Sequence, residues 1–232
     1  MRATARTALA VVALALGAAG AARAQDGPAL RPHRLTVAGG VSWAGGYALG
    51  DQAATLRGNQ AGAVAPPFTL FEARSSFTRV TGAEARVGFT LTPSLAVELG
   101  GAYARPGIAV RVSADPEAPD QTLVTDPASQ YVVDVGLVWQ LPVRGLGRRA
   151  APFVAGGGGY LRQLYAGHAL VETGQLYHLG GGVRYWLAGQ AGGGRALGLR
   201  ADVRAYVRRG GIEFESRARV YPGATVMLFA AF

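Results

Sequence analysis

Ala-Leu-Gly-Leu-Arg-Ala-Asp-Val-Arg-Ala-Tyr-Val-Arg, residues 196–208, is the stretch that decides the expected fold. Every second residue of this stretch is apolar, and these residues are Leu197, Leu199, Ala201, Val203, Ala205 and Val207. From Gly198 onward, the residues between them are glycine or carry a polar group. Below, parity means one such set of alternate residues. Because successive side chains of a strand point to opposite faces, this pattern predicts a β-strand with one apolar face. The alternation is long for a soluble strand and suits the roughly 9–11 tilted residues that cross a bilayer.

The N-terminus has the features of an export signal. Arg2 and Arg6 precede an apolar run, which ends at the cleavage pattern Ala22-Arg23-Ala24. Residues 1–24 are therefore expected to be a signal peptide, and residues 25–232 one domain. Nothing after the signal is apolar for long enough to form a membrane helix. A chain that spans a membrane without helices must form a closed barrel, since hydrocarbon offers no partner to an open sheet edge.

The composition excludes some classes of site and draws attention to glycine. The chain has no cysteine, which rules out disulfides, thiolate metal ligands and cysteine nucleophiles. Its 35 glycines include runs at residues 156–159 and 180–182. Apolar and aromatic residues flank both runs, so they favour strands over a flexible linker. Inside a narrow barrel such glycines would make room for arginines, and outside it they would let aromatic rings lie against the backbone.

The alternation recurs along the chain and predicts an all-β fold, an up-and-down antiparallel transmembrane β-barrel. Eight strands are expected, with ten as the alternative, and their ranges are 33–49, 75–91, 95–111, 130–141, 151–165, 176–187, 196–209 and 218–232. The long connections at 50–74 and 112–129 are predicted to be cell-surface loops. A parity change within the third strand predicts a β-bulge near Arg105-Pro106, because proline cannot donate to the ladder.

Alternation alone does not say which face points inward, because a soluble lipocalin-like barrel has the same period and the opposite polarity. The aromatic residues favour the membrane barrel, since two levels of them on the apolar face would form girdles at the membrane interfaces. The outer girdle is predicted to contain Tyr47, Tyr103, Tyr131 and Tyr177, and the inner girdle Phe89, Trp139, Phe153, Tyr185 and Phe232.

With these features, the chain resembles the small eight-stranded outer-membrane β-barrels of Gram-negative bacteria, the class of OmpA-type, OmpX-type and OmpW-type barrel domains. The resemblance rests on the signal end, the alternating strands and the closing Val226-Met227-Leu228-Phe229-Ala230-Ala231-Phe232. It implies location in the cell outer membrane. It also implies that the terminal Phe232 is a signal for the outer-membrane assembly machinery.

Charged residues lie at mid-strand positions on the polar parity, which is the interior face of the expected barrel. The predicted lumen network comprises Glu84, Arg86, Glu98, Asp134, Arg162, Arg184, Arg200, Asp202 and Arg204. The lumen of an eight-stranded barrel is wide enough only for side chains, so buried charges there must be paired. A salt-bridge plug is the favoured interpretation. A narrow path for small anionic or hydrophobic solutes is the alternative, because this set holds five arginines and four acids.

Catalysis has little support in the sequence. The only histidines are His33, His168 and His178, and none has a partner at metal-ligand spacing. His178 falls on the interior parity, and His168 lies in a short connection with no serine beside it. The glycine runs lack the lysine of a phosphate-binding loop. We therefore expect no enzyme activity, no metal and no cofactor.

The basic excess, a net charge of +9, points to lipid and not to nucleic acid, because the arginines are spread along the chain. Membrane lipid and lipopolysaccharide are the expected partners, and arginine suits their phosphates. The candidate contacts are Arg57, Arg74, Arg79, Arg208, Arg209 and Arg217. The alternative is that these arginines are merely solvated. The function expected is a structural or cell-surface interaction role, carried out by a monomer.

Overall fold

The computed structural model describes residues 34–57, 66–116, 118–125, 127–142, 149–165, 169–190, 193–213 and 217–232. All of them belong to the second of two compact units, Pro32–Phe232. The expected signal peptide, residues 1–24, lies outside the described residues, and so do His33 and His168. Within the described ranges, no helix is long and apolar enough to cross a membrane.

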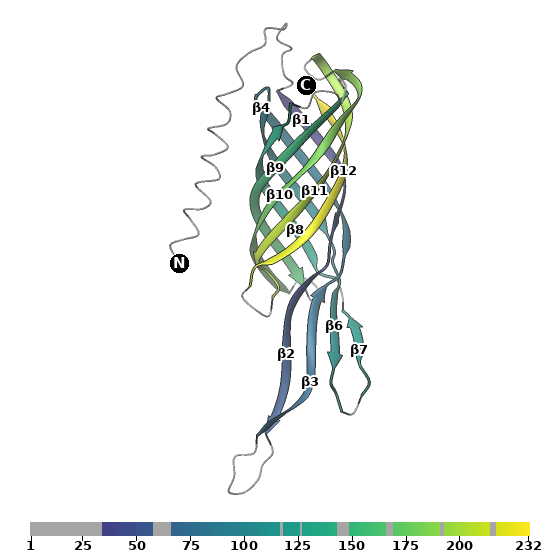
Figure 1. Cartoon of the computed structure of the whole chain (residues 1–232), viewed down its shortest axis with the longest axis vertical. Helices are drawn as coiled ribbons and strands as arrows, with labels where there is room; N and C mark the ends of the chain where they lie inside the picture. The colour runs from purple at the N-terminus through teal and green to yellow at the C-terminus, as the bar shows by residue number, and fades with distance from the viewer. Residues whose placement is uncertain are drawn as a thin grey trace, which may run out of the picture. The chain divides into compact units, whose positions relative to one another are not determined.

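Eight antiparallel strands close into a barrel, which confirms the predicted fold class and strand number (Figure 1). Around the barrel the order is β1-β12-β11-β10-β9-β8-β5-β4. Closure joins the two ends of the barrel domain, because Leu35 and Phe232 exchange backbone hydrogen bonds of 3.2 and 2.8 Å. The strands are β1 (Leu35–Ala44), β4 (Val80–Thr92), β5 (Leu95–Ala104), β8 (Ser129–Gln140), β9 (Ala150–Tyr165), β10 (Leu170–Gln190), β11 (Gly193–Gly210) and β12 (Arg219–Ala231).

The sequence suggested that the regions 50–74 and 112–129 are simple loops, but the structure shows strands in both. They contribute to a second sheet of order β2-β3-β6-β7, made of β2 (Tyr47–Arg57), β3 (Pro67–Phe77), β6 (Ile108–Ser113) and β7 (Gln121–Val124). All four strands follow or precede barrel strands at the same end of the barrel (Figure 1). The two excursions become one sheet because β3 pairs with β6, with Arg74 opposite Arg111.

The parity change near Arg105-Pro106 marks a junction between the two sheets, so the predicted β-bulge is wrong. Strand β5 ends at Ala104, and β6 begins at Ile108 in the second sheet. The backbone between them bonds to other segments, with Thr78 donating to the Gly107 carbonyl at 2.9 Å and Ala128 to the Pro106 carbonyl at 3.0 Å. Proline fits here because the chain has left the barrel ladder.

The barrel is apolar outside and charged inside. Along β11, Val203 is 63% exposed, whereas its neighbour Arg204 is 2% exposed. The same alternation holds on β12, where Val226 and Leu228 face outward and Met227 lies inside. A barrel surrounded by water would have the opposite arrangement, with apolar side chains inside and polar side chains on the outer surface. This is the polarity of a transmembrane barrel and not of the soluble lipocalin-like alternative.

Seven of the nine predicted girdle aromatics lie on the outer surface of the barrel. Tyr103 and Tyr131 face each other across β5 and β8, with ring centroids 5.0 Å apart. The outward-facing set divides between the two ends, with Tyr103, Tyr131 and Tyr177 near the second sheet and Phe89, Trp139, Tyr185 and Phe232 near the chain end.

Two predictions for strand β9 are wrong for the same reason, because its inward and outward faces were exchanged. Phe153 is 2% exposed and lies inside the barrel, not in the inner girdle, whereas Arg162 is exposed and lies outside, not in the lumen network. A shift of one residue moves every side chain of a strand to the other face. The sequence could not show the parity, because the glycine run at 156–159 separates the informative ends of β9.

Tyr47 is the second aromatic that does not belong to the outer surface. It begins β2 and packs its ring on Phe77 and Tyr221, with centroids 5.3 and 4.7 Å away. The residue is partly buried at the mouth of the barrel. The prediction failed because the strand that was expected to continue through it ends at Ala44.

Glycines fill both of the roles expected of them. Inside the barrel, a Cβ on Gly180 would lie 2.8 Å from Cγ of Arg204 and 2.1 Å from the Val203 carbonyl oxygen. Outside, a Cβ on Gly158 would lie 3.0 Å from the ring of Tyr177. The interior arginines therefore occupy space that only glycine leaves open.

Gly180→Ala is expected to destabilise the barrel by about 1–3 kcal/mol, the usual cost of forcing extra volume into a packed interior. Gly39→Ala is the matched control, because a Cβ at that outward-facing glycine meets no atom within 4 Å. Urea unfolding in lipid vesicles measures both variants. Equal midpoints would contradict the close packing of Arg204 against β10.

Candidate functional site: the charged barrel interior

Eight of the nine residues predicted for the lumen network are buried in the barrel interior. They come from β4, β5, β8, β10 and β11, and they are Glu84, Arg86, Glu98, Asp134, Arg184, Arg200, Asp202 and Arg204. The ninth, Arg162, lies outside as described above. Alternation on each strand places these side chains on one face, and closure of the barrel brings the faces together.

One half of the network is built around Arg86. Its guanidinium binds Asp134 through two nitrogens, at 3.1 and 3.2 Å, and its Nε donates to Glu84 at 2.5 Å. Asp134 also lies 3.1 Å from Nε2 of His178. The network thus includes His178, which the sequence placed in the lumen without a partner. Paired donors of this geometry are among the strong hydrogen bonds of proteins.

Arg204 connects this half to the other. Its Nη1 donates to Glu84 at 3.2 Å and its Nη2 to Asp202 at 3.1 Å. Asp202 accepts a further bond of 2.8 Å from Nε of Arg200. Arg204 is therefore the bridge between the acids of β4 and β11.

The network ends against an aromatic ring. Glu98 accepts bonds from Arg200 at 2.6 Å and from Arg184 at 2.7 Å. The guanidinium carbons of these two arginines lie 4.5 and 5.5 Å from the centroid of the Phe153 ring. This position explains the inward orientation of Phe153, since an aromatic face attracts guanidinium groups.

From Asp134 to Arg184 the charges of the network alternate, and His178 adjoins it at Asp134. In order, its members are His178, Asp134, Arg86, Glu84, Arg204, Asp202, Arg200, Glu98 and Arg184. Four arginines face four carboxylates in this network once Arg162 is placed outside. Each buried ion thus has the opposite charges that offset its cost of desolvation.

Three tyrosines lie beyond the network, toward the second sheet. Tyr221 stacks between Tyr47 and Tyr206, with centroid distances of 4.7 and 5.3 Å. Leu161 and Leu176 are buried beside them. Alternation in β11 predicts that Tyr206 faces the interior, whereas the stack with Tyr221 and Tyr47 forms only in the tertiary structure.

Arg208 lies above the tyrosines and is 1% exposed. Its Nε and Nη2 donate to the carbonyls of Gly210 and Ile212 at 2.7 and 2.8 Å, and its Nη1 donates to the Tyr47 hydroxyl. The sequence suggested Arg208 as a contact for lipopolysaccharide. The burial of Arg208 contradicts that suggestion. Arg208 lies on the same face of β11 as Arg200, Asp202 and Arg204, as the alternation over 196–208 predicts.

The opposite end of the lumen is apolar. Trp186 and Phe229 meet edge to face, with centroids 4.8 Å apart, and Met227, Ala38 and Ala231 are buried around them. The described interior therefore consists of an apolar layer, an ionic layer and an aromatic layer.

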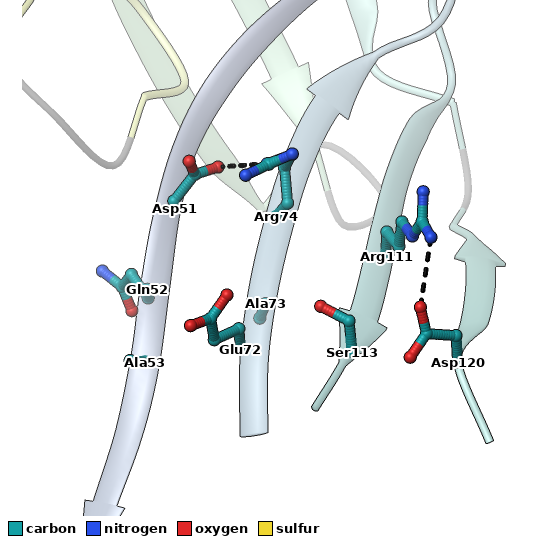
Figure 2. Close-up of a pocket in the computed structure, with 9 residues that line it drawn as sticks. All are labelled: Asp51, Gln52, Ala53, Glu72, Ala73, Arg74, Arg111, Ser113 and Asp120. Carbon is teal, nitrogen blue, oxygen red and sulfur yellow. Dashed lines mark hydrogen bonds and ion pairs between the residues drawn. The ribbon is translucent and has the colours of Figure 1, made fainter. Parts of the chain in front are cut away.

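A second group of charges lies on the exposed face of the second sheet. Figure 2 shows it as two ion pairs on neighbouring strands, Asp51–Arg74 at 3.0 Å and Arg111–Asp120 at 3.1 Å. Glu72 and Ser113 line the same shallow hollow. All four paired side chains are more than half exposed, so the pairs add little stability.

Neither group forms a metal centre. Within the described ranges, no three side chains of histidine, cysteine, aspartate or glutamate are placed to hold a metal ion.

Comparison with known proteins finds no matching family model and no matching curated protein. Several solved structures match, and two of them cover most of the chain. The β domain of the Bordetella autotransporter BrkA is 8% identical, with a TM-score of 0.33, and the match covers 85% of this chain and 98% of that chain. The outer membrane protease OmpT from Escherichia coli is 9% identical, with a TM-score of 0.35, and the match covers 87% and 97%. Similarities this low carry no information on activity.

Arg204→Ala is expected to cost about 3–5 kcal/mol, because it leaves Glu84 and Asp202 buried with one partner fewer. Val203→Ala on the outer face is the matched control and should cost much less, since it trims a methyl surface from the lipid side. Urea unfolding in vesicles compares the two neighbours. Similar midpoints would show that the network is hydrated and not structural.

Proposed function

We propose that the protein is a non-enzymatic β-barrel of the cell outer membrane, with a lumen closed by the charged network and a role at the cell surface. The observation that carries the proposal is the inverted polarity of the barrel, apolar outside and ionic inside. Such an outer surface, flanked by tyrosine and phenylalanine at the two ends, suits lipid.

The three layers of buried side chains inside the barrel support closure of the lumen. Arg200 and Arg204 are each 2% exposed, and the Trp186–Phe229 pair lies toward one end while the tyrosine stack lies toward the other. Within the network four arginines match four carboxylates, and the additional interior arginine, Arg208, is held by the Gly210 and Ile212 carbonyls and the Tyr47 hydroxyl. A conducting pore would need mobile ions to displace paired side chains.

A structural role for His178 is more consistent with its surroundings than catalysis. Its side chain is 2% exposed and bound to Asp134. A general base must reach a substrate proton within hydrogen-bond distance. The burial of His178 gives a substrate no such access, so the expectation of no enzyme activity is kept as part of the proposal.

Lipid and lipopolysaccharide are the proposed partners of the barrel. Arg79 and Arg209 are exposed at the end of the barrel that carries the second sheet, where lipid phosphates would lie in an outer leaflet. Arg57, Arg74 and Arg217 are exposed as well.

Deletion of Phe232 is expected to prevent assembly while export continues. Phe232 is exposed on the outer surface beside β12 and exchanges backbone hydrogen bonds with Leu35, so its loss removes both an outward-facing aromatic ring and the bonds that join β12 to β1 at this end. Fractionation and heat-modifiable migration on gels measure assembled protein. Recovery of wild-type protein in the soluble periplasmic fraction, or normal assembly of the truncated chain, would contradict the proposal.

Refolded protein is expected to show no steady conductance in planar bilayers, because the ionic and aromatic layers fill the lumen. Arg204→Ala and Val203→Ala provide the comparison, since only the first opens space inside the barrel. Stable, anion-selective channels in the wild type would favour the alternative of a narrow solute path.

A further inference from the structure

Strand β2 forms an open edge of the second sheet. It is first in the order β2-β3-β6-β7, and no described strand pairs with its outer side. Its segment 51–57 is exposed except for the partly buried Ala54. An edge of this length with unpaired backbone groups is a template for another strand, unless proline or inward-pointing charges block it. Residues 51–57 contain neither proline nor lysine.

The opposite edge is less suitable. Strand β7 has only four residues, and Pro119 and Asp120 precede it directly. Short strands and nearby proline are common means of protecting an edge. The edge that remains available is therefore that of β2.

The charges of β2 match a second copy of the same strand. Asp51 and Arg57 are its only charged residues, and their spacing of six residues places both on one face. In an antiparallel pair with two-fold symmetry about Ala54, Asp51 faces the partner's Arg57, and Arg57 faces the partner's Asp51. No like charges meet in this register, and the small Ala54 side chain lies on the axis. Opposite charges directly across a strand pair are stabilising.

The existing contacts leave these groups available. Asp51 accepts one bond from Arg74, and a carboxylate can accept several more. Arg57 has no ion pair with any described residue. On the other face, Leu56 pairs with Phe68, and these side chains are 51% and 50% exposed. Pairing would extend this apolar strip across the two copies.

The direction of β2 decides how two barrels would be placed. The strand begins at Tyr47, next to the end of β1, and runs away from the barrel (Figure 1). Antiparallel pairing therefore puts the two barrels at opposite ends of a joint eight-stranded sheet. Two barrels in one membrane share one orientation and cannot pair in this way, whereas barrels in two facing membranes can.

We propose that the β2 edges of two copies pair through residues 51–57, so that the protein joins two facing outer membranes. The inference rests on the proposed membrane location and replaces the sequence-based expectation of a monomer. A seven-residue strand pair is much smaller than the roughly 800 Å² per partner of a stable interface. Single contacts are therefore weak, and many copies on each membrane act together.

Clustering of lipid vesicles that carry the refolded protein tests the proposal by light scattering. Wild-type vesicles should cluster, whereas Asp51→Arg vesicles and Arg57→Asp vesicles should each cluster about tenfold more slowly or not at all, because every pair becomes a repulsion. A mixture of the two variants should cluster again, since arginines on one vesicle then face aspartates on the other.

The double variant Asp51→Arg/Arg57→Asp separates pairing from damage to the sheet. It loses the Asp51–Arg74 ion pair just as Asp51→Arg does, yet it restores opposite charges across the axis and should cluster like the wild type. Asp120→Arg, which breaks the exposed Arg111–Asp120 pair at the other side of the sheet, is the matched control and should cluster normally.

Failure of this inference is distinguishable from failure of the proposed function, because heat-modifiable migration reports the barrel independently. Dispersed wild-type vesicles with a folded barrel would overturn the pairing. The pairing would also be overturned if the Asp51→Arg and Arg57→Asp variants clustered as fast as the wild type. Loss of clustering in the Asp120→Arg variant would overturn it as well.

Discussion

The pairing of arginine with carboxylate inside a narrow barrel is the constraint on which the structure depends. An eight-stranded barrel leaves room only for side chains, and an unpaired ion there would cost several kcal/mol. The ions of the network are therefore paired, some along one strand, as Arg200 with Asp202 at 2.8 Å, and some between strands, as Arg204 with Glu84 at 3.2 Å. This requirement couples the registers of β4, β5, β8, β10 and β11, since slipping one strand by a residue would turn its charges toward lipid.

Packing follows from the same network. A guanidinium crossing the lumen needs space beside the opposite backbone, and glycine supplies it at Gly180 and also at Gly100, where a Cβ would lie 2.8 Å from Nη1 of Arg86. Phe153 faces inward for a related reason, because two arginines lie over its ring. Interior glycines and interior arginines thus occur together, because Gly100 and Gly180 leave the space that neighbouring arginine side chains occupy. The lipid side is left to apolar side chains.

The second sheet has a different physical basis. Its charged pairs are exposed and weak, and its cohesion comes from backbone pairing between two excursions of the chain. Its attachment to the barrel is specific, because Arg219 donates to the Leu49 carbonyl at 2.9 Å and Arg208 binds Tyr47. The sheet therefore continues from a rigid base formed by the aromatic layer. Of the two edges of this sheet, β2 with 11 residues is much longer than β7 with four.

The sequence by itself predicted the barrel, its eight strands and the faces of β11 and β12, because long alternation separates the two faces of a strand and the aromatic residues on the apolar face favour lipid on that side. It also located eight of the nine interior charges proposed for the lumen. It could not determine the faces of β9, since the glycine run carries no side chains to mark parity, and Phe153 and Arg162 were exchanged. Only the tertiary structure decided the ion pairs, since Arg200 and Glu98 are 102 residues apart and meet through closure of the barrel. It likewise decided that the two long connections form one sheet, because β3 and β6 supply each other's missing hydrogen bonds, and neither segment alone indicates its partner.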